Sequence, residues 1–196
     1  MRIGLFGGTF DPPHTGHLVA AQDAMVSLGL DRIVFIPAAL PPHKRERRLT
    51  PAPLRAALVA AAIAGDDRFS MDEIELLRNG PSYTVETLRA YRARHPDATL
   101  FLLVGADQYA ELHSWKSPEE IARLATLAVL DREGAPPLPG PGVVRVAVTR
   151  IDVASTDIRS RVRSGLPVRY LVPVAVEDLI RRHGLYLDGA GPARSG

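Results

Sequence analysis

The segment that most narrows the architecture of this chain is Gly7-Gly8-Thr9-Phe10-Asp11-Pro12-Pro13-His14-Thr15-Gly16-His17. An apolar, strand-like run over residues 3–6 precedes it, and an Ala-rich helical segment follows it. Glycines let the backbone approach a ligand, and the free N–H groups of a helix start favour an anion. The segment therefore predicts a strand, a glycine turn and a helix start that together cradle phosphate.

Three residues within this segment suggest chemistry as well as shape. His14 and His17 are three positions apart, so both can face the same way from the first helical turn. Gly16 costs helix stability at such an early position, which indicates that something bulky lies against the backbone there. Alternatives are a simple tight turn, a surface histidine pair or a zinc site. Zinc needs three or four ligands, whereas the chain has no Cys and no further His nearby.

The pattern Gly-Gly-Thr-Phe-Asp-Pro-x-His-x-Gly-His resembles the signature of the nucleotidyltransferase superfamily, in the form found in the nicotinate-nucleotide adenylyltransferase family. That resemblance implies a Rossmann-like, doubly wound α/β fold with a mainly parallel sheet in a single domain. It implies adenylyl transfer from ATP to nicotinate mononucleotide, giving deamido-NAD and pyrophosphate in NAD biosynthesis. It also implies that His14 and His17 are catalytic and that ATP is bound by Gly7, Gly8, Thr9, Phe10 and Gly16.

Length and composition are consistent with this class. The chain has 196 residues, of which 46% are hydrophobic, so we expect one domain over residues 1–188 and a disordered tail over 189–196. The absence of Cys excludes disulfides, iron–sulfur ligation and thiol catalysis. A formal charge of +2 is too weak to argue for nucleic-acid binding. The N-terminus has no apolar signal region and no apolar run could span a bilayer, so we expect a cytoplasmic protein without a membrane partner. A homo-oligomer remains open.

The remaining strands are expected where apolar, β-branched runs are short. Arg32–Pro37 and residues 99–104, 124–130 and 143–148 have this pattern, and residues 69–76 suit an edge strand. The dinucleotide motif Gly-x-Gly-x-x-Gly and the Walker phosphate loop are both absent. Gly105 and Asp107 follow the most apolar run, so we expect them at the mouth of the site, because ligands gather at the carboxyl ends of strands. Asp107 either caps the next helix or, as the resemblance implies, contacts the adenosine side of ATP.

Residues 41–48 form a Pro-Pro-His-Lys-Arg-Glu-Arg-Arg loop with a dense positive charge. It could be a solvated basic loop. The resemblance places His43 and Lys44 near the phosphate of nicotinate mononucleotide, with Lys44 catalytic, and leaves Arg45, Arg47 and Arg48 undecided. Thr50-Pro51 predicts the cap and first position of a helix over residues 54–64.

Two further segments could contact the pyridine ring. Ser82-Tyr83-Thr84 stands before a helix that Ser82 or Thr84 could cap. The resemblance instead makes all three residues ligands of nicotinate mononucleotide, with backbone N–H groups near Thr84 facing the carboxylate. Trp115 is the only Trp, and an aromatic face suits stacking on a flat ring. Lys116 stands where the family commonly has Tyr, so only its backbone N–H is carried over.

A second signature lies near the C-terminus, in Ser155-Thr156-Asp157-Ile158-Arg159. It predicts a helix capped by Ser155 and ended by Gly165, and the helix from 173 to 183 follows. The resemblance implies that Ser155 and Thr156 bind ATP and that Arg159 is catalytic, although Ala154 replaces a usual Ser.

The resemblance also implies direct in-line attack without a covalent intermediate, and Mg²⁺ carried on the ATP phosphates without a metal site in the protein. Alternatives are another adenylyl- or cytidylyltransferase, such as the phosphopantetheine enzyme, or a non-catalytic nucleotide-binding module.

Overall fold

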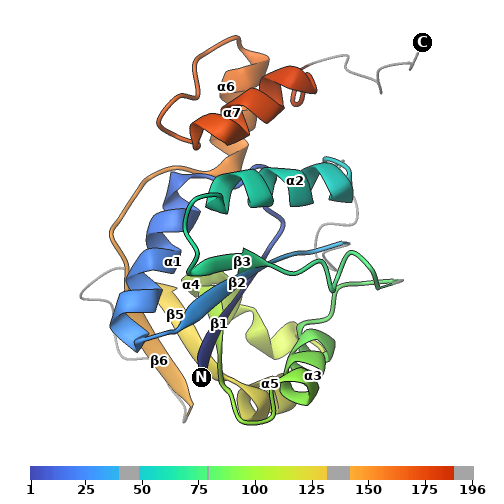
Figure 1. The fold of residues 1–196 in the computed structure, drawn as a ribbon, viewed down its shortest axis with the longest axis vertical. Helices are drawn as coiled ribbons and strands as arrows, with labels where there is room; N and C mark the ends of the chain where they lie inside the picture. Colours follow the sequence, from blue (N-terminus) through green and yellow to red (C-terminus); the bar gives the residue numbers. More distant parts are fainter. Residues whose placement is uncertain (40–48, 79, 132–141, 188–196) are drawn as a thin grey trace.

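A computed structural model describes residues 1–39, 49–78, 80–131 and 142–187 (Figure 1). In this part of the chain, six strands form one sheet in the order β3-β2-β1-β4-β5-β6, and every neighbouring pair runs parallel. The strands are β1 Arg2–Gly8, β2 Arg32–Pro37, β3 Phe69–Met71, β4 Thr99–Gly105, β5 Thr126–Asp131 and β6 Val143–Ala147. This arrangement confirms the predicted doubly wound α/β fold.

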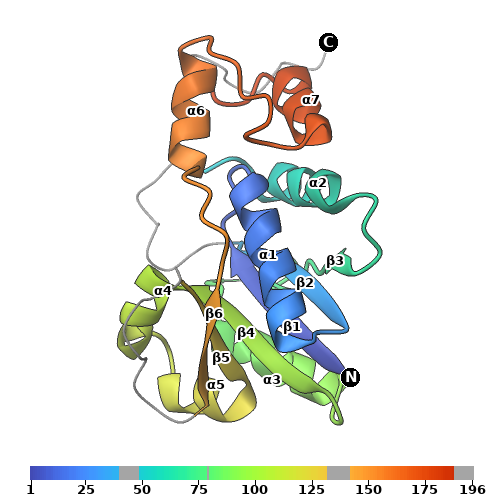
Figure 2. The same ribbon diagram turned by 90° about the vertical axis from the view of Figure 1, so that its left-hand side faces the viewer.

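Helices cover both faces of the sheet (Figure 2). The helices are α1 Thr15–Leu28, α2 Ala52–Ile63, α3 Thr84–Arg94, α4 Ala106–Ala110, α5 Pro118–Leu124, α6 Ser155–Arg163 and α7 Val174–Arg182, with a short 3₁₀ turn at Leu112–Ser114. Alternate residues of β1 point to opposite faces. Ile3 and Leu5 pack with Val85 and Leu88 of α3, whereas Phe6 packs on the side of α1 and α2. Because both faces are buried, the strands read as nearly continuous apolar runs.

The last two helices form an additional layer on α2 (Figure 1). Leu58 and Ala62 of α2 share a buried cluster with Ile158 of α6 and with Val176 and Ile180 of α7. This layer brings the start of α6 close to the glycine turn, where the Ser155 hydroxyl donates to the Pro12 carbonyl at 2.8 Å. Two signatures that are about 140 residues apart in sequence are therefore adjacent in space.

Several local predictions about helix starts were wrong. The N-cap positions of α2, α3 and α6 are occupied by Pro51, Tyr83 and Ala154, without side-chain capping bonds. Ser82 accepts a hydrogen bond from the Ala39 N–H instead, and Ser155 binds Pro12. These tertiary partners outcompete the local cap.

The strands differ slightly from the predicted ranges. β3 is an edge strand as expected but ends at Met71, and Leu124 belongs to α5 rather than to β5. The basic segment with His43, Lys44, Arg45, Arg47 and Arg48 and the tail 189–196 lie outside the described residues. In the described ranges, none of the helices has the length and apolar character needed to cross a membrane.

Candidate active site

Two cavities meet at the carboxyl end of β1. One has a volume of about 300 Å³ and the other about 430 Å³. Gly7, Gly8 and Thr9 line both cavities, and so does Gln108 of α4. The glycine turn therefore lies between two neighbouring cavities, as expected for a site at the carboxyl ends of parallel strands.

Glycine stands at positions 7, 8 and 16 for different structural reasons. A Cβ on Gly8 would lie 2.7 Å from the ring of Phe10. Phe10 is buried, and its backbone φ is +47°. A Cβ on Gly7 would meet nothing within 4 Å, so this backbone is open to both cavities. A Cβ on Gly16 would lie 3.1 Å from Nδ1 of His14. The bulky group predicted beside Gly16 therefore includes the His14 ring of the chain itself.

His14 and His17 lie at the start of α1 with their rings stacked, at 3.7 Å between centroids. The His14 backbone N–H donates to Nδ1 of His17 at 3.2 Å. Nδ1 of His17 is therefore an acceptor, so the proton of a neutral His17 ring is on Nε2. Phe10 holds the same ring edge-on at 5.1 Å, and His17 lines the larger cavity.

His14 is more enclosed than His17. It is 8% exposed, and burial lowers its pKa to about 4. Its Nδ1 has no hydrogen-bond partner among the described residues. At neutral pH this imidazole is uncharged, and its ring stacks on that of His17.

The 430 Å³ cavity has the character of an anion site. Arg159 of α6 lines it, and its Nη1 donates to the Asp11 carbonyl at 2.7 Å while Nη2 donates to the Thr156 hydroxyl at 3.2 Å. These bonds hold the planar guanidinium in place, and the N-terminus of α6 adds a partial positive charge. The predicted ATP ligands that line this cavity are Gly7, Gly8, Thr9, Phe10, Gly105, Ser155 and Thr156.

A third cavity, of about 410 Å³, shares Phe6, His17 and Ala20 with the anion cavity. His14 and Gly16 line it, together with apolar side chains such as Leu130 and Ile151. Asp107 is exposed and lines none of these three cavities, and it does not cap α4, because the N-cap is Gly105 and Asp107 lies within the first turn.

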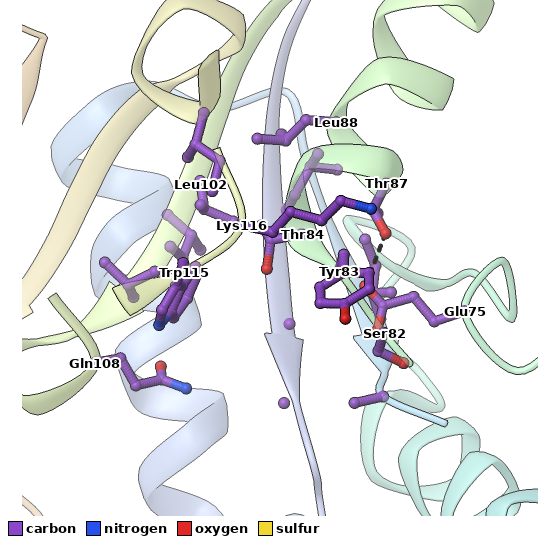
Figure 3. A pocket seen from close by; sticks show the side chains of 18 of the residues that line it. Glu75, Ser82, Tyr83, Thr84, Thr87, Leu88, Leu102, Gln108, Trp115 and Lys116 are labelled. Atoms are coloured by element: carbon purple, nitrogen blue, oxygen red, sulfur yellow. Dashed lines mark hydrogen bonds between the residues drawn. The ribbon is translucent and has the colours of Figure 1, made fainter. Parts of the chain in front are cut away.

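The 300 Å³ cavity contains all the predicted acceptor ligands that the structure describes (Figure 3). They are Ser82, Tyr83, Thr84, Trp115 and Lys116. The Trp115 ring stands on one wall, and the start of α3 forms the opposite wall (Figure 3). The Lys116 side chain is partly exposed, and its Nζ lies 2.6 Å from Glu86 Oε1.

Glu75 is a cavity residue that the sequence did not single out. Its side chain is buried, and its Oε1 accepts a hydrogen bond from the Thr87 hydroxyl at 2.8 Å. Burial raises the pKa of this carboxyl, while bonds from Thr87 and Ser82 and the charge of Arg78 oppose the shift. Glu75 thereby fixes the Ser82–Thr87 side of the cavity.

Asp11 connects the glycine turn to distant segments. Its side chain is buried and accepts from the Tyr186 hydroxyl at 2.8 Å and from the Thr50 N–H at 3.2 Å. Its carbonyl accepts from Arg159, as described above. Burial, followed by the Asp11 charge, raises the pKa of Tyr186.

Arg55 of α2 is a second residue that was missed. It is 1% exposed and donates to the carbonyls of Thr9 at 2.9 Å, Ala39 at 3.1 Å and Thr50 at 2.9 Å. One guanidinium therefore ties the glycine turn to the residues on both sides of segment 40–48. The only signal in the sequence was an arginine inside an otherwise apolar helical run.

Comparisons with known proteins show the family of the chain. The family model described as Cytidylyltransferase-like matches residues 5–161. A Thermus thermophilus protein named "Probable nicotinate-nucleotide adenylyltransferase" is 48% identical over 190 residues, which cover 95% of this chain and 100% of that protein. A Shouchella clausii protein with the same name is 42% identical over 187 residues, covering 95% and 97%.

A solved structure, the Plasmodium falciparum nicotinic acid mononucleotide adenylyltransferase complexed with NaAD, has the same fold. Its TM-score is 0.78 at 16% identity, and the match covers 94% of this chain and 97% of that chain. Together with the relatives above, the matches span nearly the whole chain. The chain belongs to the nicotinate-nucleotide adenylyltransferase family, within the Cytidylyltransferase-like proteins.

Proposed function

We propose that this chain transfers the adenylyl group of ATP to nicotinate mononucleotide, forming deamido-NAD and releasing pyrophosphate. The observation that carries the proposal is the meeting of two unlike cavities at residues 7–9. One cavity has an aromatic wall and a helix start, and the other has a histidine and a fixed arginine. The name of its curated relatives supports the same reaction.

ATP is the donor and occupies the larger cavities. Its triphosphate lies between His17, Arg159 and the start of α6, where N–H groups and positive charge favour phosphate. The adenosine extends into the 410 Å³ cavity, whose apolar lining of Phe6, Leu130 and Ile151 suits a flat base.

Nicotinate mononucleotide is the acceptor and occupies the 300 Å³ cavity. Its pyridine ring stacks on Trp115, and its carboxylate faces the start of α3 at Thr84. Among the described residues, the backbone N–H groups of Thr84 and Val85 have no hydrogen-bond partner. They are donors, which suits an acceptor group that carries negative charge. The backbone N–H of Lys116 is a further donor to this carboxylate.

The two substrates react directly. An oxygen of the acceptor phosphate attacks the α-phosphorus of ATP, and the bond between that phosphorus and the bridging oxygen of the leaving pyrophosphate breaks. The electron pair of that bond goes to pyrophosphate, so no protein nucleophile is needed. The residues position both phosphates and stabilise the negative charge that spreads in the transition state.

Named side chains have distinct parts in this step. His17 donates from Nε2, because its Nδ1 is occupied by the His14 N–H. Arg159 grips phosphate oxygens with a guanidinium that Asp11 and Thr156 already orient. Lys44 remains a predicted catalytic residue and His43 a predicted acceptor ligand near the acceptor phosphate, because both lie outside the described residues.

Mg²⁺ accompanies ATP in this proposal. Within the residues that the structure describes, no group of three or more His, Asp or Glu side chains could hold a metal ion. In this proposal the ion is held mainly by phosphate oxygens and water, as Mg²⁺ commonly is. The ion supplies charge neutralisation on the triphosphate.

Pyrophosphate release with a panel of acceptors tests the proposal. The purified chain with ATP and Mg²⁺ receives nicotinate mononucleotide, nicotinamide mononucleotide or phosphopantetheine, and the nucleotide product is identified. We expect release with nicotinate mononucleotide and formation of deamido-NAD. Release only with phosphopantetheine would indicate another adenylyltransferase, and ATP binding without release from any acceptor would indicate a non-catalytic module.

A further inference from the structure

The Lys116 side chain crosses the acceptor cavity from the Trp115 wall to the α3 wall (Figure 3). Its Nζ lies 2.6 Å from Glu86 Oε1 and 4.3 Å from the centroid of the Tyr83 ring. Both Tyr83 and Lys116 line the cavity. A full positive charge is therefore held at the cavity end where α3 begins.

This charge changes the electrostatic balance of that cavity end. Glu75 and Glu86 both lie on the α3 side, and an entering carboxylate would meet the negative charge of Glu86. Glu75 is buried with its Oε1 bonded to Thr87. The N–H groups at the start of α3 supply only a partial positive charge. A cationic side chain therefore strengthens the preference of this end for a carboxylate over a neutral amide.

The ion pair with Glu86 is easily exchanged. The Lys116 side chain is 45% exposed, and exposed ion pairs contribute only about 0–1 kcal/mol. Glu86 also has a second cation, because Arg78 Nη1 lies 3.7 Å from its Oε2. When Lys116 leaves, Glu86 keeps a partner, so no isolated charge remains.

We infer that the Lys116 ammonium is a specificity-determining group, which exchanges Glu86 for the carboxylate of the acceptor. This inference rests on the proposed function and extends it, since the prediction from the sequence used only the backbone N–H at this position. In the free protein Glu86 holds the ammonium at the cavity, and in the complex the ammonium pairs with the pyridine carboxylate.

Replacing Lys116 by Met tests the inference, because the variant keeps the backbone N–H and most of the side-chain length. The kcat/KM values for nicotinate and nicotinamide mononucleotides are measured for wild type, Lys116→Met and Arg181→Met. Arg181, in an exposed pair with Asp178 on α7, controls for the loss of one charge. We expect Lys116→Met to lower kcat/KM for the nicotinate acceptor about five- to tenfold, mainly through KM, with the nicotinamide value within about twofold of wild type.

Other outcomes contradict the inference in different ways. An equal loss for both acceptors would indicate that Lys116 contacts the acceptor phosphate or has a purely structural role. No loss for either would indicate a solvated ion pair. If wild type itself used neither acceptor, the proposed function would fail, whereas an active wild type with an unchanged acceptor ratio in Lys116→Met would overturn only this inference.

A Glu86→Gln variant tests the exchange step. Removing the competing carboxylate should raise kcat/KM for the nicotinate acceptor about two- to threefold in the wild-type background. The gain should disappear in the Lys116→Met background, because no ammonium remains to be released. An equal gain in both backgrounds would indicate direct repulsion by Glu86, and no gain in the wild-type background would contradict the competition.

Discussion

His14 and His17 have different roles in the proposed reaction, although their rings stack on one another. His17 lines the anion cavity and receives the His14 N–H on Nδ1, and we propose that its Nε2 faces the triphosphate. His14 is buried, and its low pKa keeps it neutral at physiological pH. At the scale of single residues, we propose that His17 contacts the triphosphate, and the catalytic role of His14 stays a prediction.

The His17→Ala variant separates catalysis from folding. Removing one preorganised transition-state donor should lower kcat by roughly 10²–10⁴-fold. The loss of a capping acceptor should lower the free energy of unfolding by no more than about 2 kcal/mol. Kinetics and denaturant unfolding are compared with those of His183→Ala, which removes an exposed histidine after α7. Unchanged activity per folded molecule, with a collapse of stability, would make His17 structural.

His14 should make stability depend on pH. Its pKa is about 4 in the folded chain and near 6.5 when unfolded, so the unfolded state binds more protons between these values. The free energy of unfolding should therefore fall as pH decreases from about 6.5 to 4, by up to about 3 kcal/mol from this residue. Urea unfolding at pH 7 and pH 5 measures this, with His14→Gln as the reference for all other groups. Parallel pH curves for the two proteins would refute the assignment.

At the scale of elements, the site depends on contacts that fix where strands and helices end. The strands were predictable because burial on both faces produces short apolar runs such as β4. The helix caps were not, because Ser82 and Ser155 have tertiary partners that no local rule contains. Arg55 was missed for the same reason, since its three carbonyl partners come from two distant segments and one nearby turn.

Arg55→Lys tests whether this residue positions the site. A lysine cannot reach all three carbonyls, and buried unsatisfied groups cost about 1–3 kcal/mol, so stability should fall. Because the glycine turn and the flanks of segment 40–48 lose their common anchor, KM should rise for both substrates about three- to tenfold. Arg92→Lys is the control, since Arg92 donates to the carbonyls of Ala98 and Leu124, and these residues line none of the three cavities. Equal stability losses with unchanged KM in both variants would give Arg55 a structural role only.

At the scale of the whole molecule, the parallel strands bring motifs that are distant in the sequence together at their carboxyl ends. The glycine turn, the Ser-Tyr-Thr segment, Trp115 and Arg159 could be placed at the site from the sequence, because each belongs to a short motif of the resembled family, and all of them line the cavities. The hydrogen bonds of Asp11 with Tyr186 and Arg159 could not be predicted from the sequence, because they form only after α6 and α7 pack against α2. The catalytic role of Lys44 stays a prediction, and so does the single domain over residues 1–188.

The central claim is that the 300 Å³ cavity selects a carboxylate, and the ratio of kcat/KM for nicotinate over nicotinamide mononucleotide tests it most directly. Trp115 should stack on both rings alike, so the difference arises at the start of α3, where the backbone N–H donors and the Lys116 ammonium face the carboxylate. An amide would direct its NH₂ toward donors, at a cost of about 1–3 kcal/mol, and would lose the charge term as well. We predict a ratio of about 100 or more, since about 1.4 kcal/mol corresponds to a factor of ten. A ratio near one, or one in favour of the amide, would contradict the proposed carboxylate site.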